Sequence, residues 1–137
     1  TNLDVTGNAI INADLTANSL TIGSGIYQFS RTSMFFATTI SSAPQQILAL
    51  DAAGLAGVDL VIISTDATNN SRQITKLSIV IYDGVLSYND TSTLAVNNYL
   101  CEFSVNYVSV DNEIQINSTP AFANFMDHKM QIVAYND

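Results

Sequence analysis

The stretch Lys76 to Asn89, K-L-S-I-V-I-Y-D-G-V-L-S-Y-N, predicts a β-hairpin, and this hairpin decides the fold class of the chain. Two runs of residues with high β-propensity flank the pair Asp83-Gly84. The pair suits a two-residue type I′ turn, because that turn needs φ > 0 at both central positions. The resulting register sets three pairs of residues opposite one another: Tyr82 and Val85, Ile81 and Leu86, and Ile79 and Tyr88.

This register places an almost wholly apolar set of side chains on one face of the hairpin. A two-stranded ribbon is marginal in water and cannot bury such a face by itself. We therefore expect the rest of the chain to cover it. The set consists of Leu77, Ile79, Ile81, Leu86 and Tyr88.

The composition predicts a single all-β domain with a short appendage. The chain has 137 residues, of which 47% are apolar and only 12% are charged, about half the usual ~25%. Asn, Thr and Ser supply the polarity instead, which suits strands joined by turns better than exposed helices. A surface with so little charge also suggests that other subunits cover part of it.

The charge balance excludes some classes of partner. The net charge is −8, with four basic residues against twelve acidic ones. Nucleic-acid binding needs a basic stripe to neutralise phosphates, so we expect no nucleic-acid partner. An anionic membrane surface is disfavoured for the same reason, and no run approaches the ~20 apolar residues of a membrane helix, so we expect no membrane insertion.

Residues 1–25 differ from the rest of the chain. They contain no aromatic and no basic residue, and short apolar pairs recur about every five residues between Asn, Asp and Gly positions. The segment is too short to form a core. We favour an intertwined stem that packs against identical copies, and the alternative is an N-terminal hairpin packed on its own domain. Gly23-Ser24-Gly25 would then form a hinge to a head domain over residues 26–137.

The head contains seven or eight short candidate strands and no convincing long helix. Residues 46–57 are ambiguous, because a strand-like start is followed by an Ala-rich stretch that suits one helical turn. Residues 121–128 are expected to form a loop with Phe122 and Phe125 tucked beneath it. This pattern predicts an antiparallel β-sandwich or jelly roll. The clearest strands cover residues 33–40, 58–65 (a central strand), 76–82, 99–110, 113–117 and 129–135.

The sequence offers no convincing catalytic or metal-binding constellation. His128, the only histidine, stands beside Asp127 and is expected to be a solvated loop residue without a second metal ligand at suitable spacing. Alternation predicts that Cys101 is buried, which argues against a Cys101–His128 dyad. No G-x-S-x-G motif is present. We expect no enzyme, no cofactor and no metal. The carboxylates that glycoside hydrolysis would require, Asp83, Asp90, Asp111 and Glu113, all lie at predicted turns.

Exposed tyrosines with polar neighbours are the only candidate ligand-binding residues. Tyr88, Asn89 and Asp90 at a hairpin end, and Tyr99 after Asn97-Asn98, can stack on a sugar ring and hydrogen-bond its hydroxyl groups. The alternative is that these aromatic residues merely cover the sheet.

Several segments of the chain resemble virion fibre and appendage proteins of tailed phages, above all those of cyanobacterial and other marine phages. The hairpin of that family more often has His before its Asp-Gly turn, where this chain has Tyr82. The resemblance implies a trimeric β-structured virion component, either a fibre, a neck appendage or a capsid decoration, and it transfers no catalytic residue. Its segments are the stem run from Leu3 to Ile22, Val58 to Asp66, Lys76 to Gly84, Tyr99 to Val110 and Ile114 to Pro120.

We therefore expect a homotrimeric phage structural protein on the virion surface. Its partners would be sister copies, other virion proteins and a host-surface glycan bound by the head. A monomeric carbohydrate-binding or adhesin module is the alternative. A small hydrolase is a third hypothesis, and it would lose activity when Asp90, Asp111 or Asp127 is changed.

Overall fold

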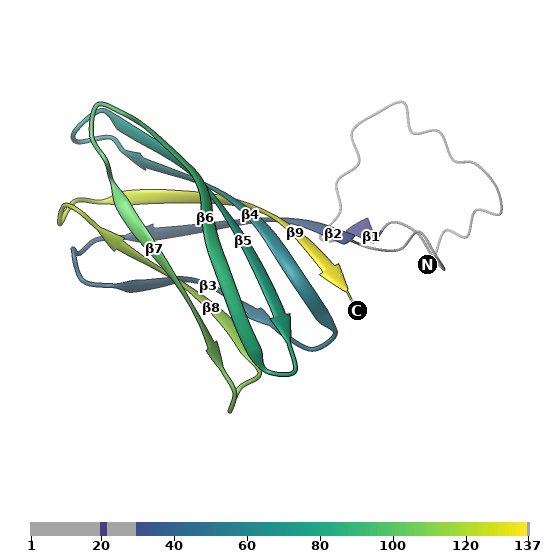
Figure 1. Ribbon diagram of the computed structural model, residues 1–137. Coiled ribbons are helices and arrows are strands. Elements are labelled where there is room, and N and C mark those ends of the chain that lie inside the picture. Colours follow the sequence, from purple (N-terminus) through teal and green to yellow (C-terminus); the bar gives the residue numbers. More distant parts are fainter. Residues whose placement is uncertain (1–19, 22–29, 137) are drawn as a thin grey trace, which may run out of the picture.

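The protein is an all-β sandwich of two antiparallel sheets, which face each other in Figure 1. The computed structural model describes residues 20–21 and 30–136. Sheet A has the strand order β1-β2-β9-β4-β5-β6, and sheet B has the order β3-β8-β7. The strands are β1 (Leu20–Thr21), β2 (Ser30–Thr39), β3 (Gln45–Asp51), β4 (Leu55–Asp66), β5 (Ser71–Tyr82), β6 (Val85–Val96), β7 (Cys101–Val108), β8 (Glu113–Pro120) and β9 (Met126–Asn136).

The hairpin predicted from the sequence is confirmed as β5–β6. Asp83 and Gly84 have φ values of 49° and 72°, as a type I′ turn requires. The three expected residue pairs are all present in the register. Local turn chemistry therefore sets the alignment of two twelve-residue strands.

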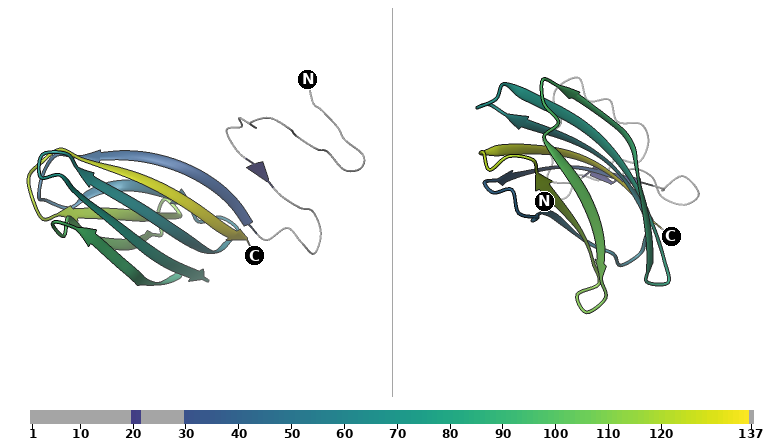
Figure 2. Two further views of the ribbon diagram at one scale, coloured as in Figure 1. Left: turned by 90° about the horizontal axis from the view of Figure 1, so that it is seen from above. Right: turned by 60° about the vertical axis from the view of Figure 1, so that its left-hand side comes forward.

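The predicted apolar face of this hairpin is buried only on the β5 side. Leu77, Ile79 and Ile81 are at most 6% exposed, whereas Leu86 is partly buried and Tyr88 is 41% exposed. The reason is the unequal width of the sheets, since β6 is the edge of a six-stranded sheet that faces only three strands. The views in Figure 2 show the smaller sheet against part of the larger one.

The core lies between β4, β5 and β9 of sheet A and the three strands of sheet B. β4 is central, because it pairs with both β5 and β9, as predicted for residues 58–65. Alternation along β8 buries Ile114 and Ile116 completely, again as expected. The largest apolar residues that meet there are Leu60, Ile62, Leu77, Ile79, Ile114, Ile116, Met130 and Ile132.

One ambiguity is resolved and one local expectation is wrong. The Ala-rich part of residues 46–57 forms a tight turn and no helical turn, because Asp51 Oδ1 accepts the N–H of Ala53 and the N–H of Leu55 bonds to the carbonyl of Ala52. Phe122 and Phe125 are 38% and 62% exposed. The core at that end is a separate buried cluster of Leu100, Cys101 and Met126, and neither phenylalanine belongs to it.

Most of the predicted stem lies outside the described residues, and so does the predicted hinge. The described part of that segment, β1, pairs antiparallel with β2 of the same chain, with Leu20 opposite Thr32 and Thr21 opposite Arg31. None of the described segments is a helix of the length and apolarity needed to cross a membrane.

Candidate functional site

The four predicted glycan-contact residues lie along edge strand β6 and the connection that follows it. Tyr88, Asn89 and Asp90 lie within β6, so their expected position at a hairpin end is wrong, because the strand continues to Val96. Tyr99 lies in the connection between β6 and β7, and its side chain is 48% exposed. The two tyrosines therefore remain accessible at one edge of the sandwich.

Asp90 and Tyr99 lie within electrostatic reach of each other. The pKa of Tyr99 is raised, first by burial and then by the negative charges of Glu102 and Asp90. The carboxylate of Asp90 already accepts hydrogen bonds from the N–H of Ser92 at 3.1 Å and from Thr93 Oγ1 at 2.8 Å. These bonds brace β6 where its register with β5 shifts between Asp90 and Ser92. The half-exposed ring of Tyr99 is the better surface for stacking.

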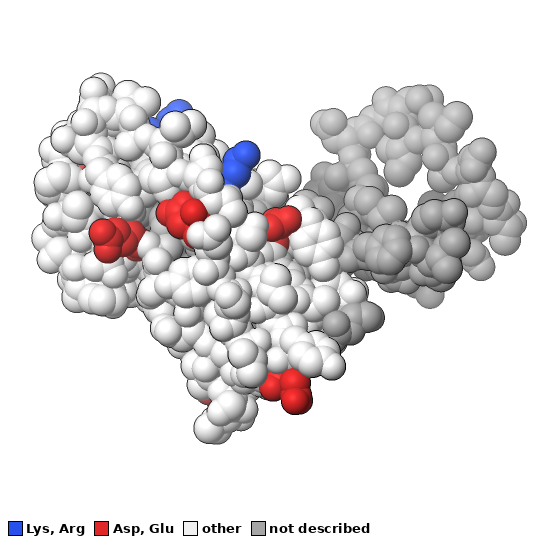
Figure 3. Space-filling view, in the orientation of Figure 1, with Lys and Arg blue, Asp and Glu red and all other residues white. Residues whose placement is uncertain are grey.

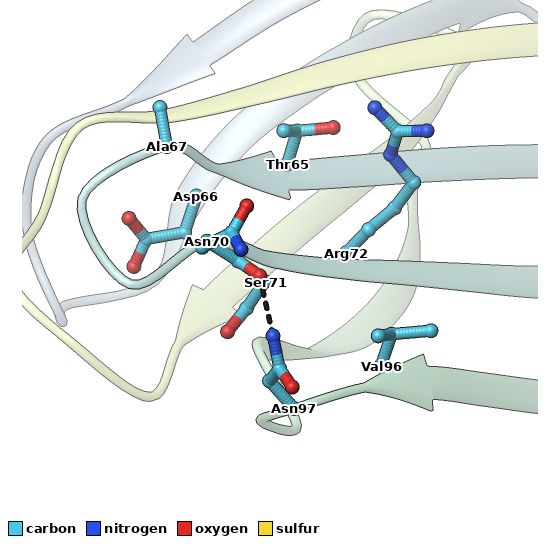
Figure 4. Close-up of a pocket in the computed structure, with 8 residues that line it drawn as sticks. All are labelled: Thr65, Asp66, Ala67, Asn70, Ser71, Arg72, Val96 and Asn97. Atoms are coloured by element: carbon cyan, nitrogen blue, oxygen red, sulfur yellow. Dashed lines mark hydrogen bonds between the residues drawn. The ribbon is translucent and has the colours of Figure 1, made fainter.

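A pocket of about 500 Å³ opens where the β4–β5 turn meets the end of β6. Figure 4 shows the residues around it, with the side chain of Arg72 extending past β4 beside Thr65. The lining combines hydroxyl, amide, carboxylate and guanidinium groups with two apolar side chains. Its members are Thr65, Asp66, Ala67, Asn70, Ser71, Arg72, Val96 and Asn97.

Two turns with left-handed residues build this pocket. Asn70 and Asn97 have φ values of 48° and 67°, a conformation that Asn tolerates better than most residues. Asn97 Nδ2 donates to the carbonyl of Asn70 at 2.7 Å, and Asn98 Nδ2 donates to Ser71 Oγ at 3.0 Å. These bonds tie the β4–β5 turn to the β6–β7 connection, so the pocket has a braced rim.

The pocket lining suits a polar ligand with an anionic group. A guanidinium can hold a carboxylate or sulfate through paired hydrogen bonds, and the neighbouring hydroxyl and amide groups match sugar hydroxyl groups. The sequence did not nominate these residues, because Asn70 and Asn97 are explained by turn chemistry alone. Only the pairing of β5 with β6, which sets Arg72 opposite Val96, brings them together.

A second polar cluster lies buried between the sheets and includes His128. The expectation of a solvated loop histidine is wrong, since His128 lies in β9 and is 1% exposed. Its Nδ1 is 2.9 Å from Ser64 Oγ, and its Nε2 is 3.1 Å from Thr39 Oγ1. The Oγ of Ser64 also lies 3.4 Å from the Sγ of Cys101, and the imidazole packs edge-on against Phe103.

Burial sets the chemistry of this cluster. Desolvation lowers the pKa of His128 from 6.5 to about 4, although the charge of Asp127 opposes the shift. Burial likewise raises the pKa of the Cys101 thiol, and the contact with Ser64 Oγ only partly offsets this effect. Cys101 is buried, as predicted. The imidazole and thiol are therefore neutral at pH 7 and closed to an external substrate.

The carboxylates considered for hydrolysis lie on different elements. Asp83 lies at the β5–β6 turn, Asp111 and Glu113 lie around the β7–β8 turn, and Asp90 lies within β6. Among the described residues, no group of three or more His, Cys, Asp or Glu side chains is placed to hold a metal ion.

Comparisons with known proteins give a structural likeness but no match to a family model or a curated protein. Among solved structures, the chain is similar to the Acinetobacter phage vB_ApiP_P1 tailspike protein, with a TM-score of 0.41 and 9% sequence identity over 91% of this chain. The match covers 25% of the tailspike chain, so this chain spans about a quarter of that protein's length.

Proposed function

We propose that the chain is a structural protein of a tailed-phage virion, either a fibre, a neck appendage or a capsid decoration. In this proposal residues 26–137 form a head that projects from the particle, and residues 1–25 contribute to a trimeric stem. The support from the sequence is the likeness of five segments to phage fibre and appendage proteins.

The observation that carries the proposal is the exposure of many large apolar side chains in a domain with little surface charge. A solitary soluble domain rarely leaves extended apolar patches in water, and larger patches mark surfaces that contact other molecules. Such a head belongs in an assembly. The large apolar side chains that are at least 59% exposed are Met34, Phe36, Ile40, Val80, Tyr82, Val85, Leu94, Val96, Val110 and Phe125.

The head also offers a place for a host-surface glycan. Tyr88, Asn89, Asp90 and Tyr99 remain our proposed contact residues along the β6 edge. The pocket that contains Arg72 lies at the end of the same strand. A sugar chain that stacks on Tyr99 would reach this pocket along β6, and an acidic sugar would fit its guanidinium best.

Solution mass and particle labelling test the structural role. Sedimentation equilibrium of the whole chain should give three times the 14.7 kDa monomer mass. Antibodies against the head should label intact purified virions. A monomer that melts at a higher temperature with sugar would instead favour the alternative carbohydrate-binding module.

Glycan binding needs its own control. We expect Tyr99→Ala to weaken retention on an array of bacterial capsular and lipopolysaccharide glycans by about fivefold, since one aromatic stack contributes about 1 kcal/mol. Tyr82→Ala removes a 79% exposed tyrosine beside the β5–β6 turn and should leave retention unchanged. The proposed contact would be contradicted if both variants lost retention equally. It would also be contradicted if the wild-type protein were not retained on any glycan.

A further inference from the structure

The outer face of sheet A carries a row of four apolar side chains and one lysine that crosses five strands. Strand pairing aligns Phe36 of β2, Lys129 of β9, Ile63 of β4, Ile74 of β5 and Leu94 of β6 side by side. Phe36 and Leu94, at the two ends of the row, are 70% and 71% exposed. Ile74 is 38% exposed and Ile63 is partly buried, so the row is most open to solvent at its two ends.

The same face carries all the basic residues whose side chains the structure describes. Arg72 and Lys76 are exposed positions between buried ones on β5, and Lys129 has the same place on β9. Two carboxylates share the face. Asp59 accepts hydrogen bonds from Ser78 and Tyr135, and Asp127 accepts one from Thr38. The face thus combines charges of both signs with apolar side chains.

The opposite outer face, on sheet B, has a different chemistry. Its residues alternate with the buried ones of β3, β7 and β8 and are almost entirely amides, hydroxyls and acids. Cross-strand pairing groups Glu102 with Thr119, Ser104 with Asn117, and Asn106 with Gln115. This face has the polarity of a surface that stays in water.

The rest of the head surface carries few charged residues. In Figure 3, the basic residues lie near the upper margin of the head and the acidic ones are scattered among many uncharged residues. Away from the outer face of sheet A, the described charged side chains are acidic: Asp51, Asp66, Asp83, Asp90, Glu102, Asp111 and Glu113.

We propose that the outer face of sheet A, apart from the corner around Arg72 that lines the pocket, is the surface through which copies of this chain contact one another. The inference rests on the proposed function and specifies which face the assembly uses. A second copy is the fitting occupant, because this face alone holds both cations and carboxylates. Around a threefold axis the cations of one copy can therefore meet the carboxylates of the next. Contact through the acidic remainder of the surface would bring like charges together.

The size of the face agrees with such a contact. From Asp127 to Tyr135 it runs about 27 Å along β9, and five strands at about 4.8 Å spacing span roughly 19 Å. Its projected area is on the order of 500 Å². Two such faces together would bury about 1,000 Å², which is the lower end for a specific protein interface.

Thiol accessibility in the whole chain tests the proposal. Leu94→Cys and Phe36→Cys place a thiol at either end of the row, whereas Val110→Cys places one at a 92% exposed position beside the β7–β8 turn. The native Cys101 is 1% exposed and should stay silent. We expect a bulky maleimide to react at least tenfold more slowly at positions 94 and 36 than at position 110, and dilution into monomers should abolish the difference.

The outcomes separate this inference from the proposed function. A trimer in which all three thiols react equally fast would leave the proposed function standing and overturn the interface. A thiol at position 94 that reacts fast in the purified oligomer and becomes protected only in virions would assign the face to another virion protein, and this result also overturns the inference. A wild-type chain that sediments as a monomer at all concentrations would overturn the proposed trimer and the interface together.

Discussion

The Oγ of Ser64 and the Nδ1 of His128 lie 2.9 Å apart, on directly paired residues of β4 and β9. Both side chains point between the sheets, and they are 0% and 1% exposed. A neutral imidazole has one donor and one acceptor nitrogen, so the hydroxyls of Ser64 and Thr39 together satisfy it without a charge. This arrangement fixes the protonation state that the folded protein prefers.

We expect folding stability to decrease in mild acid because of this histidine. The pKa of His128 is 6.5 in the unfolded chain and about 4 when folded. Between these values the unfolded chain binds one more proton, so stability falls as the pH falls, by about 1.4 kcal/mol per pH unit and about 3 kcal/mol in all. Urea titrations between pH 7 and pH 5 measure this slope.

The matched control is His128→Gln, which removes the only histidine of the chain. Its free energy of unfolding should be lower at pH 7 but nearly independent of pH from 7 to 5. A wild-type slope that persists in this variant would show that another group controls the acid response.

Gln73 should be among the costliest polar side chains to replace. Its Oε1 accepts the N–H of Leu100 at 2.7 Å, and its Nε2 donates to the carbonyl of Cys101 at 2.8 Å, so it joins β5 to the start of β7. Gln73→Leu leaves these buried backbone groups without partners, and we expect a loss of about 3 to 5 kcal/mol in urea unfolding. Gln115→Leu on the outer face of sheet B should cost less than about 0.5 kcal/mol.

Two glycines should respond to alanine for different reasons. A Cβ at Gly57 would lie 2.8 Å from the carbonyl oxygen of Ile79, and this backbone atom cannot easily move aside. We expect Gly57→Ala to cost about 3 kcal/mol. Gly54 has φ +68° and nothing within 4 Å of an added Cβ, so Gly54→Ala should cost only about 1 kcal/mol of backbone strain. Thermal melts that reverse this order would contradict the assigned contact.

Asp66 should stabilise the β4–β5 turn only while it is ionised. Its carboxylate accepts bonds from the N–H groups of Thr68 and Asn69 and from the side chains of Asn69 and Asn124. The pKa of Asp66 is lowered, chiefly by the bond from Asn124, although burial opposes this shift. Such a group contributes stability above its unfolded pKa and loses it as the pH falls further.

The variant Asp66→Asn therefore has a pH-dependent cost. It should be about 2 kcal/mol less stable at pH 7, because one oxygen acceptor becomes a donor that faces other donors. The difference from the wild type should shrink below pH 3.8, because the unfolded wild-type chain then binds a proton at Asp66 that the folded chain still excludes. An unchanged difference at pH 3 would show that packing and not charge controls the turn.

Much of the candidate site was beyond prediction. Tyr88, Asn89, Asp90 and Tyr99 were nominated from the sequence, yet their placement in and after an edge strand depends on the strand order of sheet A, in which β6 comes last. The pocket around Arg72 needs the β5–β6 register together with the bonds between the Asn70 and Asn97 turns. No local pattern reports the meeting of two turns that are 27 residues apart.

The sequence by itself determined the features that depend on neighbouring residues. Asp83-Gly84 set the turn and register of the β5–β6 hairpin, and strict alternation identified the buried faces of β7 and β8. Both were predictable because turn geometry and the two-residue period of a strand are local properties. Only the tertiary structure decided that His128 belongs to a strand, that it meets Ser64, and that one side of β6 remains uncovered. These features depend on which distant strands pair and on the unequal width of the two sheets, and both follow from packing across the whole chain.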